Sequence, residues 1–308
     1  MLHRALGASG IDVSVLSLGS WRTYEHISPE QGLAVMRAAQ ECGINFLDDA
    51  RYNDETGKAP LATGYSEVVF GELFRAAGWK RDEAVVANKL WWEFWPAESA
   101  RQVLDSSLTR MSFDYVDLIY ATTPPEGLGA AEIVDSVVGL ISSGKARAWG
   151  VVNWPPGLLA AATRIASANG TPPPAAAQVA YNVVWRSSLE GAEESAALEE
   201  SGAGVVASAV LVYGALTGKY AHAEATGRIA AKLDEPLIKQ ALDAAPGLVE
   251  LAARFSTTPA ALAIAFALAG PRVASVLFGA TRPEQVLANA EALDVDPAAV
   301  AELQSSRG

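Results

Sequence analysis

Several polar residues stand at the ends of short apolar segments, where packing alone does not need them. Asp48 and Asp49 end one such segment, and Lys89, Asn153 and Gln178 end three others. A buried polar group costs free energy unless it is hydrogen-bonded or has a function. Comparable positions are held by Gly19, Ser20, Trp21, Thr122, Tyr181, Asn182, Ser208, Gly279, Ala280, Thr281 and Arg282. A carboxylate, an ammonium and two amides gathered in this way predict one functional site that handles a polar ligand.

The elements that must position this site are eight apolar, β-branched segments with helical patterns between them. They span residues 13–19, 44–49, 84–89, 116–121, 147–152, 176–181, 204–211 and 274–279. Parallel strands that are covered on both faces have this composition. Eight such units without a break in composition predict a single domain over residues 1–308, a (β/α)8 TIM barrel. A doubly wound open sheet is the alternative.

Local signals refine this prediction. The opening LGASGIDVS has a glycine-centred turn and predicts a small N-terminal β-hairpin that caps the bottom of the barrel. Ser28 followed by Pro29 predicts a helix start, and Gly43 predicts the end of that helix. The longest irregular stretches, 52–65 and 212–234, follow the second and seventh strands. In a barrel of this kind such loops lie over the C-terminal face, where chemistry occurs.

Composition excludes several classes of function. The 308 residues are 50% hydrophobic and carry a formal net charge of −12, so binding to nucleic acid or to an anionic membrane is not expected. The single cysteine, Cys42, excludes an intramolecular disulfide. No secretory signal opens the chain, and the longest apolar run, at 260–270, is shorter than the roughly 18 residues of a membrane span. We therefore expect a cytoplasmic protein, while the sequence leaves its oligomeric state open.

Six motifs, taken in order, resemble the aldo-keto reductase superfamily, and specifically its bacterial and potassium-channel β-subunit-like branch. They are INFLDDARY, VVANKLWW, GKARAWGVVN, QVAYN, GALTGKY and FGATRPEQVLAN, and the match covers roughly residues 4–292. The resemblance implies an NADPH-dependent oxidoreductase that reduces the carbonyl group of a small molecule on a (β/α)8 barrel. The fold implied in this way agrees with the strand count.

The resemblance also implies catalytic roles. A Tyr serves as general acid in the family, and Tyr52 is the candidate in this chain. A free phenol has a pKa near ~10, so a neighbouring ammonium that favours the phenolate would help proton donation. Lys89 is that ammonium, and Asp48 pairs with it. Thr122 stands where the family has a His that polarises the carbonyl group.

A cofactor site for NADP(H) follows from the same resemblance. Asn153 and Gln178 would hold the nicotinamide carboxamide, and Arg282 would bind the 2′-phosphate at a helix N-terminus, which favours NADP over NAD. Gln285 and Asn289 would lie beside the adenosine. The remaining cofactor-binding candidates are Gly19, Ser20, Trp21, Asp48, Ser208, Leu211, Gly279 and Thr281. No metal site is expected.

Four departures from the family pattern concern this site. Thr122 replaces the His, and Val152 replaces a Ser before Asn153. Ser208 stands where an aromatic residue usually stacks on the nicotinamide, a role that Trp185 or Tyr213 would have to take over. Tyr52 follows Asp48 by four residues, one fewer than usual, while Asn53 holds the usual offset; a one-residue loop deletion is the simpler interpretation.

These features leave three functions open. The first is a reductase with an altered pocket for a hydrophobic or flat substrate. The second is an NADP(H)-binding protein with weak turnover that acts as a regulatory or interaction subunit, and the third is an unrelated barrel enzyme such as a lyase. Retention of Asp48, Tyr52 and Lys89 favours the first, because a pure binding module needs no tuned acid. Trp91, Trp92 and Trp95 either wall the substrate pocket or anchor a packed loop.

Overall fold

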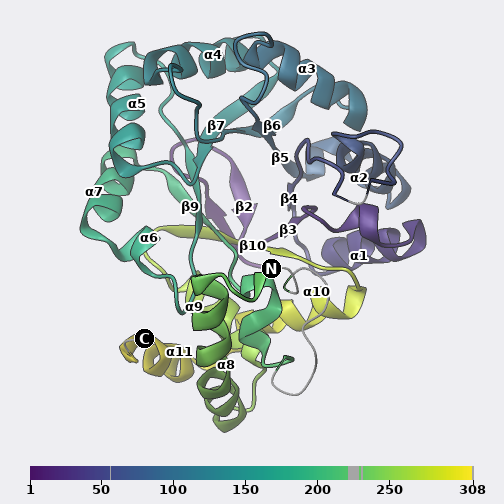
Figure 1. Cartoon of the computed structure of the whole chain (residues 1–308), viewed down its shortest axis with the longest axis vertical. Coiled ribbons are helices and arrows are strands. Elements are labelled where there is room, and N and C mark those ends of the chain that lie inside the picture. The colour runs from purple at the N-terminus through teal and green to yellow at the C-terminus, as the bar shows by residue number, and fades with distance from the viewer. Residues whose placement is uncertain (56, 221–228, 230–231, 307–308) are drawn as a thin grey trace.

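Eight parallel strands close into a barrel in the computed structural model, which describes residues 1–55, 57–220, 229 and 232–306. Within the barrel the order is β10-β3-β4-β5-β6-β7-β8-β9, so the predicted (β/α)8 fold is confirmed and the open sheet is excluded. Figure 1 shows the strands at the centre with the helices around them. The barrel strands are β3 Leu16–Gly19, β4 Phe46–Asp48, β5 Val85–Leu90, β6 Val116–Ala121, β7 Ala146–Val152, β8 Ala176–Ala180, β9 Gly204–Ser208 and β10 Val273–Gly279.

Helices follow the strands and cover the outside of the barrel. The first of them starts as the sequence predicts, because the Ser28 hydroxyl accepts the amide of Gln31 at 3.2 Å and Pro29 occupies the first turn. The helices are α1 Pro29–Glu41, α2 Tyr65–Ala76, α3 Ala100–Met111, α4 Ala130–Ser142, α5 Pro156–Ala168, α6 Ser187–Glu190, α7 Ala192–Ser201, α8 Pro236–Arg254, α9 Pro259–Leu268, α10 Pro283–Ala290 and α11 Pro297–Ser305.

The predicted hairpin is also confirmed. Strands β1 His3–Ala5 and β2 Asp12–Ser14 pair in antiparallel fashion, and Leu6 packs in one buried cluster with residues of the barrel interior. Gly7 allows this contact because its φ is +55° and a Cβ there would lie 2.3 Å from the Ala175 carbonyl oxygen. The hairpin therefore closes the end of the barrel opposite the expected site.

Two strand predictions need correction. The predicted strand 13–19 is two strands, because residues up to Ser14 pair in the hairpin while Leu16 begins the barrel. The predicted strand 204–211 ends at Ser208, because Ala209 has a φ of +53° and turns the chain out of the sheet. Residues 221–228, 230 and 231 of the predicted loop 212–234 lie outside the described residues.

Within the described residues no single helix is long and apolar enough to cross a membrane. Only α8 and α9 taken together reach that length and composition, and they are bent by 94° at the break between them.

Candidate active site

Four polar side chains meet inside the C-terminal end of the barrel. The Lys89 ammonium donates to one oxygen of the Asp48 carboxylate, and the Gln178 side-chain amide donates to the other at 3.0 Å. The same Lys89 Nζ donates to the hydroxyl oxygen of Tyr52 at 3.1 Å. Only 3% of the Asp48 side chain and 5% of the Lys89 side chain are exposed. The barrel thus brings together a buried ion pair, a phenol and an amide. Asp48, Lys89 and Gln178 lie on strands β4, β5 and β8, and Tyr52 lies on the turn after β4.

Tyr52 reaches Lys89 although its spacing from Asp48 is one residue short. The turn that carries it is tight, with the Tyr52 amide bonded to the Ala50 carbonyl at 2.9 Å and the Gly64 amide bonded to the Tyr52 carbonyl at 2.8 Å. Asn53, at the usual family offset, instead is exposed and pairs with Thr63 in a short bridge. The arrangement agrees with the interpretation of a one-residue loop deletion.

The electrostatics of Tyr52 differ from the expectation. Burial, followed by the Asp48 carboxylate, raises the pKa of the Tyr52 phenol well above its ordinary value. Lys89 does not reverse this shift, because its charge is already matched by Asp48 in the buried pair. The phenol is therefore protonated at neutral pH, and the hydrogen bond from Lys89 leaves its proton to be donated to another group.

Thr122 does not replace the family His in the way the sequence suggests. Its hydroxyl donates to the Leu90 carbonyl at 2.8 Å, and its own carbonyl accepts the indole N–H groups of Trp92 and Trp154 at 3.1 and 2.9 Å. A hydroxyl has one proton to donate, so this proton is not directed at a substrate. In this structure Thr122 acts as a junction between two strand ends and two indoles.

The three tryptophans after Lys89 have different surroundings. Trp92 is 6% exposed and bonded to Thr122, and Trp95 donates to Glu132 on α4 at 3.4 Å, so both anchor the loop. Trp91 packs its ring against Tyr52, with centroids 6.3 Å apart and an edge-on geometry. Only Trp91 of the three therefore borders the phenol.

The two amide residues expected at the nicotinamide lie side by side. Val152 pairs with Gln178 across β7 and β8, so Asn153 follows directly beside Gln178. The Asn153 side-chain oxygen accepts the Ala180 amide at 3.3 Å, while the Gln178 amide is bonded to Asp48. Gln178 thus links the expected cofactor side of the site to the ion pair.

The chain after β9 runs in an unusual conformation at the rim of the barrel. Ala209, Val212, Tyr213 and Gly214 all have positive φ, and Leu211 lies between them with its carbonyl bonded to Gly214 at 2.9 Å. Ser208 ends β9 beside Ala180. Strain of this kind in non-glycine residues is typical of functional turns.

Trp21, two residues after β3, packs beside this turn. It is 38% exposed, and its ring centroid is 5.9 Å from that of Tyr213. Gly19 pairs with Gly279 on one side and Asp48 on the other, which brings the glycines of two strand ends to the level of the ion pair.

The N-terminus of α10 already has a side-chain cap. The Gln285 carbonyl oxygen accepts from the backbone amides of Thr281 and Arg282 at 2.8 and 3.3 Å, although Gln285 is expected beside the adenosine. Arg282 is exposed, and within the described residues it forms no ion pair. Asn289 is 5% exposed on the inner face of the helix. A phosphate at this helix start would take the place of the Gln285 oxygen.

A second buried polar cluster lies on the outer side of the strands and joins two predicted site residues, Ser20 and Asp49, with residues that were not predicted. The Ser20 hydroxyl, expected at the cofactor, donates to Asp49 instead. Glu67 on α2 accepts from Asn88 at 2.9 Å and from Arg110 at 2.6 Å. Alternation along a strand is the signal that separates Asp48, which faces inward, from Asp49, whereas nothing in the sequence marks Glu67 as buried.

Burial, together with the charge of Glu67, raises the pKa of the Asp49 carboxyl well above its ordinary value. In the folded state Asp49 keeps its proton at pH values where the unfolded state, with a carboxyl pKa of about 4, has lost it. Between the pKa of the unfolded state and the raised pKa of the folded state, the free energy of unfolding therefore decreases as pH rises. Asn cannot ionise and keeps the oxygen that accepts from Ser20. We expect Asp49→Asn to gain free energy of unfolding relative to the wild type, by up to about 1.4 kcal/mol for each pH unit inside the window.

Denaturant unfolding of both proteins between about pH 5 and pH 8 measures this difference. A difference that stays constant with pH would mean that Asp49 is ionised in the folded protein.

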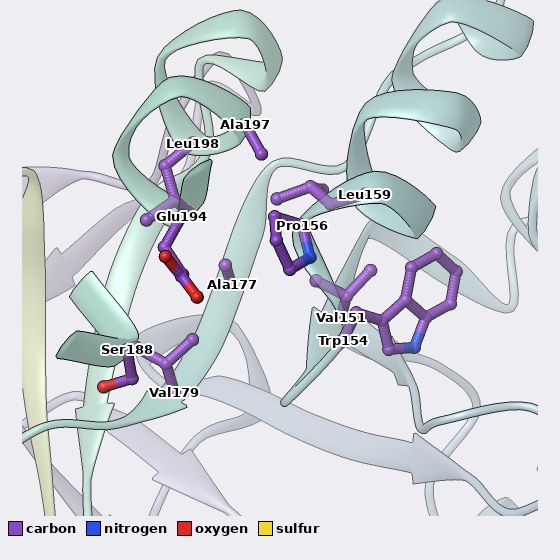
Figure 2. Close-up of a pocket in the computed structure, with 10 residues that line it drawn as sticks. All are labelled: Val151, Trp154, Pro156, Leu159, Ala177, Val179, Ser188, Glu194, Ala197 and Leu198. Carbon is purple, nitrogen blue, oxygen red and sulfur yellow. The ribbon is translucent and has the colours of Figure 1, made fainter. Parts of the chain in front are cut away.

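A separate small pocket lies outside the barrel, between α5 and α7 (Figure 2). Its volume is about 30 Å³, and Glu194 is the only ionisable residue that lines it. It contains none of the predicted site residues. The described part of the chain also holds no group of three or more His, Cys, Asp or Glu that could bind a metal ion.

Comparison with known proteins agrees with the fold. A sequence model of the Aldo/keto reductase family matches residues 15–307. A probable voltage-gated potassium channel subunit beta from Oryza sativa subsp. japonica is 31% identical, with 96% of this chain and 92% of the relative covered. One of the same description from Arabidopsis thaliana is 30% identical at the same coverage. A putative one from Schizosaccharomyces pombe is 31% identical, with 94% and 88% covered. The chain therefore belongs to the aldo/keto reductase family of oxidoreductases.

Proposed function

We propose that this protein is an NADP(H)-dependent oxidoreductase that reduces the aldehyde or ketone group of a small, hydrophobic or flat molecule. The observation that carries the proposal is the Lys89 ammonium placed between the Asp48 carboxylate and the Tyr52 hydroxyl, 3.1 Å from the latter. A site that only binds a ligand has no use for a protonated phenol held in this way. The proposal includes the expected single domain and cytoplasmic location.

The residues at the barrel mouth fit the cofactor. Two amides, Asn153 and Gln178, suit a carboxamide, and two cations, Arg282 and Lys219, follow β10 and β9. Lys219 lies close over the strained turn, since a Cβ on Gly214 would be 2.7 Å from its Nζ. Amides at one end and cations at the rim match a nicotinamide and its phosphates. When bound, the reduced cofactor supplies the hydride.

The chain's own groups supply and control the proton. Tyr52 donates its hydroxyl proton to the oxygen of the substrate carbonyl. This leaves a phenolate on Tyr52. Lys89 stabilises the phenolate through the hydrogen bond that it already donates to the Tyr52 hydroxyl oxygen. Asp48, itself held by Gln178, keeps the ammonium oriented. Trp91 borders the phenol with an apolar ring, which favours a flat or hydrophobic substrate.

The test is consumption of NADPH by the purified protein with a panel of aldehydes and ketones. Consumption that depends on the carbonyl compound supports the reductase. The names of the relatives favour a second candidate, a nucleotide-binding regulatory subunit with weak turnover. Tight binding of NADPH, with no consumption of NADPH in the presence of any carbonyl compound of the panel, would favour that function instead.

Arg282 tests the choice of cofactor. We expect Arg282→Ala to weaken NADPH binding by about 1.5–3 kcal/mol, the range for a charged hydrogen bond, with little change for NADH. Titration of both nucleotides measures the effect, and Arg101→Ala, which removes an exposed arginine from α3, is the control. Equal losses for both nucleotides would show that Arg282 does not bind the 2′-phosphate.

A further inference from the structure

The residue that precedes Tyr52 is an almost completely buried arginine. The Arg51 side chain is 5% exposed, and one of its terminal nitrogens lies 2.8 Å from the Glu93 carboxylate. A second carboxylate, from Glu98, lies 3.8 Å from the other terminal nitrogen. The guanidinium also lies 4.9 Å from the centre of the Phe94 ring. All three partners belong to one segment, residues 91–98, which follows β5.

This segment also borders the phenol. Trp91 contacts the Tyr52 ring, and Trp92 is fixed by its bond to the Thr122 carbonyl. Segment 91–98 is thus anchored at Thr122, which follows β6, and at Glu132 on α4. It touches the turn 49–53 through both Trp91 and the partners of Arg51. Because Arg51 and Tyr52 are adjacent, a shift of the first is passed directly to the second.

The energetics of Arg51 argue against a purely stabilising role. Burial of a guanidinium costs free energy, and an apolar residue of similar size often replaces a buried ion pair without loss. The Nε of Arg51 is buried and has no hydrogen-bond partner among the described residues, so the cost is only partly offset. The carboxylate partners, in contrast, are 38% and 42% exposed. The contribution of Arg51 to stability therefore does not account for a buried charge beside Tyr52 in the chain, whereas a role in positioning Tyr52 does.

We propose that Arg51 is a positioning residue that fixes the Tyr52 hydroxyl on Lys89 by tying the turn 49–53 to segment 91–98. The proposal rests on the proposed function, since it assigns Arg51 to the proton donor of that reaction. The tight spacing between Asp48 and Tyr52 makes this tie necessary, because the turn has no spare residue to absorb a displacement.

The test compares Arg51→Met with the wild type and with Tyr52→Phe. Methionine keeps an unbranched apolar side chain and removes the guanidinium group that contacts Glu93 and Glu98. We expect kcat to fall about tenfold with KM for NADPH unchanged, because a displaced general acid loses part of a 10²–10⁴-fold contribution. In the Tyr52→Phe background the same change should alter kcat by less than about twofold, since residues that act as one unit are not additive. Arg51→Lys should recover part of the loss.

Arg81→Met is the matched control. Arg81 also forms an ion pair, with Asp117, and lies over aromatic rings, but it precedes β5 at the opposite end of that strand. It should change the melting temperature without changing kcat. An equal loss of kcat from Arg51→Met with and without the Tyr52 hydroxyl would overturn the positioning role, and so would an effect confined to KM.

The proposed function and this inference fail in different ways. Absence of turnover in the wild type would overturn the function alone. Ultraviolet difference spectra of the phenol at neutral pH, taken as wild type minus Tyr52→Phe and as Arg51→Met minus Arg51→Met/Tyr52→Phe, would then still report whether Arg51→Met displaces Tyr52 from Lys89. Identical difference spectra would overturn the inference.

Discussion

Replacement of Tyr52 by Phe is expected to lower kcat by about 10²-fold or more, the scale of general acid catalysis, while NADPH binding stays nearly intact. The change removes one oxygen atom, the one that accepts from Lys89 at 3.1 Å, and leaves the ring that packs on Trp91. The pocket therefore keeps its shape and loses only its proton donor. Steady-state turnover of a responsive carbonyl compound and a separate NADPH titration measure the two quantities.

Tyr181→Phe is the matched control for this experiment. The Tyr181 hydroxyl already donates to Glu190 at 2.6 Å, so its loss should leave kcat unchanged. Wild-type kcat in Tyr52→Phe would mean that another group supplies the proton, and Tyr24, buried near Asp49, would then be the next phenol to replace.

Lys89→Met is expected to reduce the free energy of unfolding by about 3–5 kcal/mol, because it leaves the Asp48 carboxylate buried without its cation. Asp48 is 2% exposed, and the remaining hydrogen bond from Gln178 does not neutralise its charge. Turnover should fall as well, since the phenolate loses the hydrogen bond that stabilises it. Denaturant unfolding at neutral pH measures the stability term apart from activity.

A second variant separates charge from packing. Lys89→Met combined with Asp48→Asn removes both charges and should recover most of the lost stability without recovering turnover. If Lys89→Met alone costs less than about 1 kcal/mol, the pair behaves like a solvent-exposed ion pair and the description of a buried site is wrong.

The barrel was predictable from sequence because each strand is apolar on both faces and the helices carry ordinary start signals such as Ser28–Pro29. The errors fall where backbone conformation overrides side-chain pattern. Residues 13–19 are all suited to a strand, yet Ser14 pairs in the hairpin and Leu16 in the barrel. Apolar character continues past Ser208, but Ala209 turns the chain out of the sheet.

The sequence predicted which strand ends meet in the candidate site, but it did not predict the individual hydrogen bonds there. Asp48, Lys89 and Gln178 come together because parallel strands end at one edge. The partners of Thr122 and Gln285 are local groups, a strand carbonyl and helix amides, that compete with any ligand. Arg51 was not predicted as part of the site because its partners lie more than forty residues later in the chain, in an irregular segment.

The hydrogen bond between Gln178 and Asp48 joins residues 130 positions apart in the chain. It crosses the inside of the barrel, so it forms only after β4 and β8 belong to the same closed cylinder, which β10 completes by pairing with β3. Contacts of such long range form late in folding, because the entropy of closing the chain opposes them until much else is in place. The Lys89–Asp48 pair itself joins the neighbouring strands β4 and β5, whereas the Gln178 bond that completes the site needs the closed barrel. A fragment that stops before β10 should therefore lack this bond even where its own strands are paired.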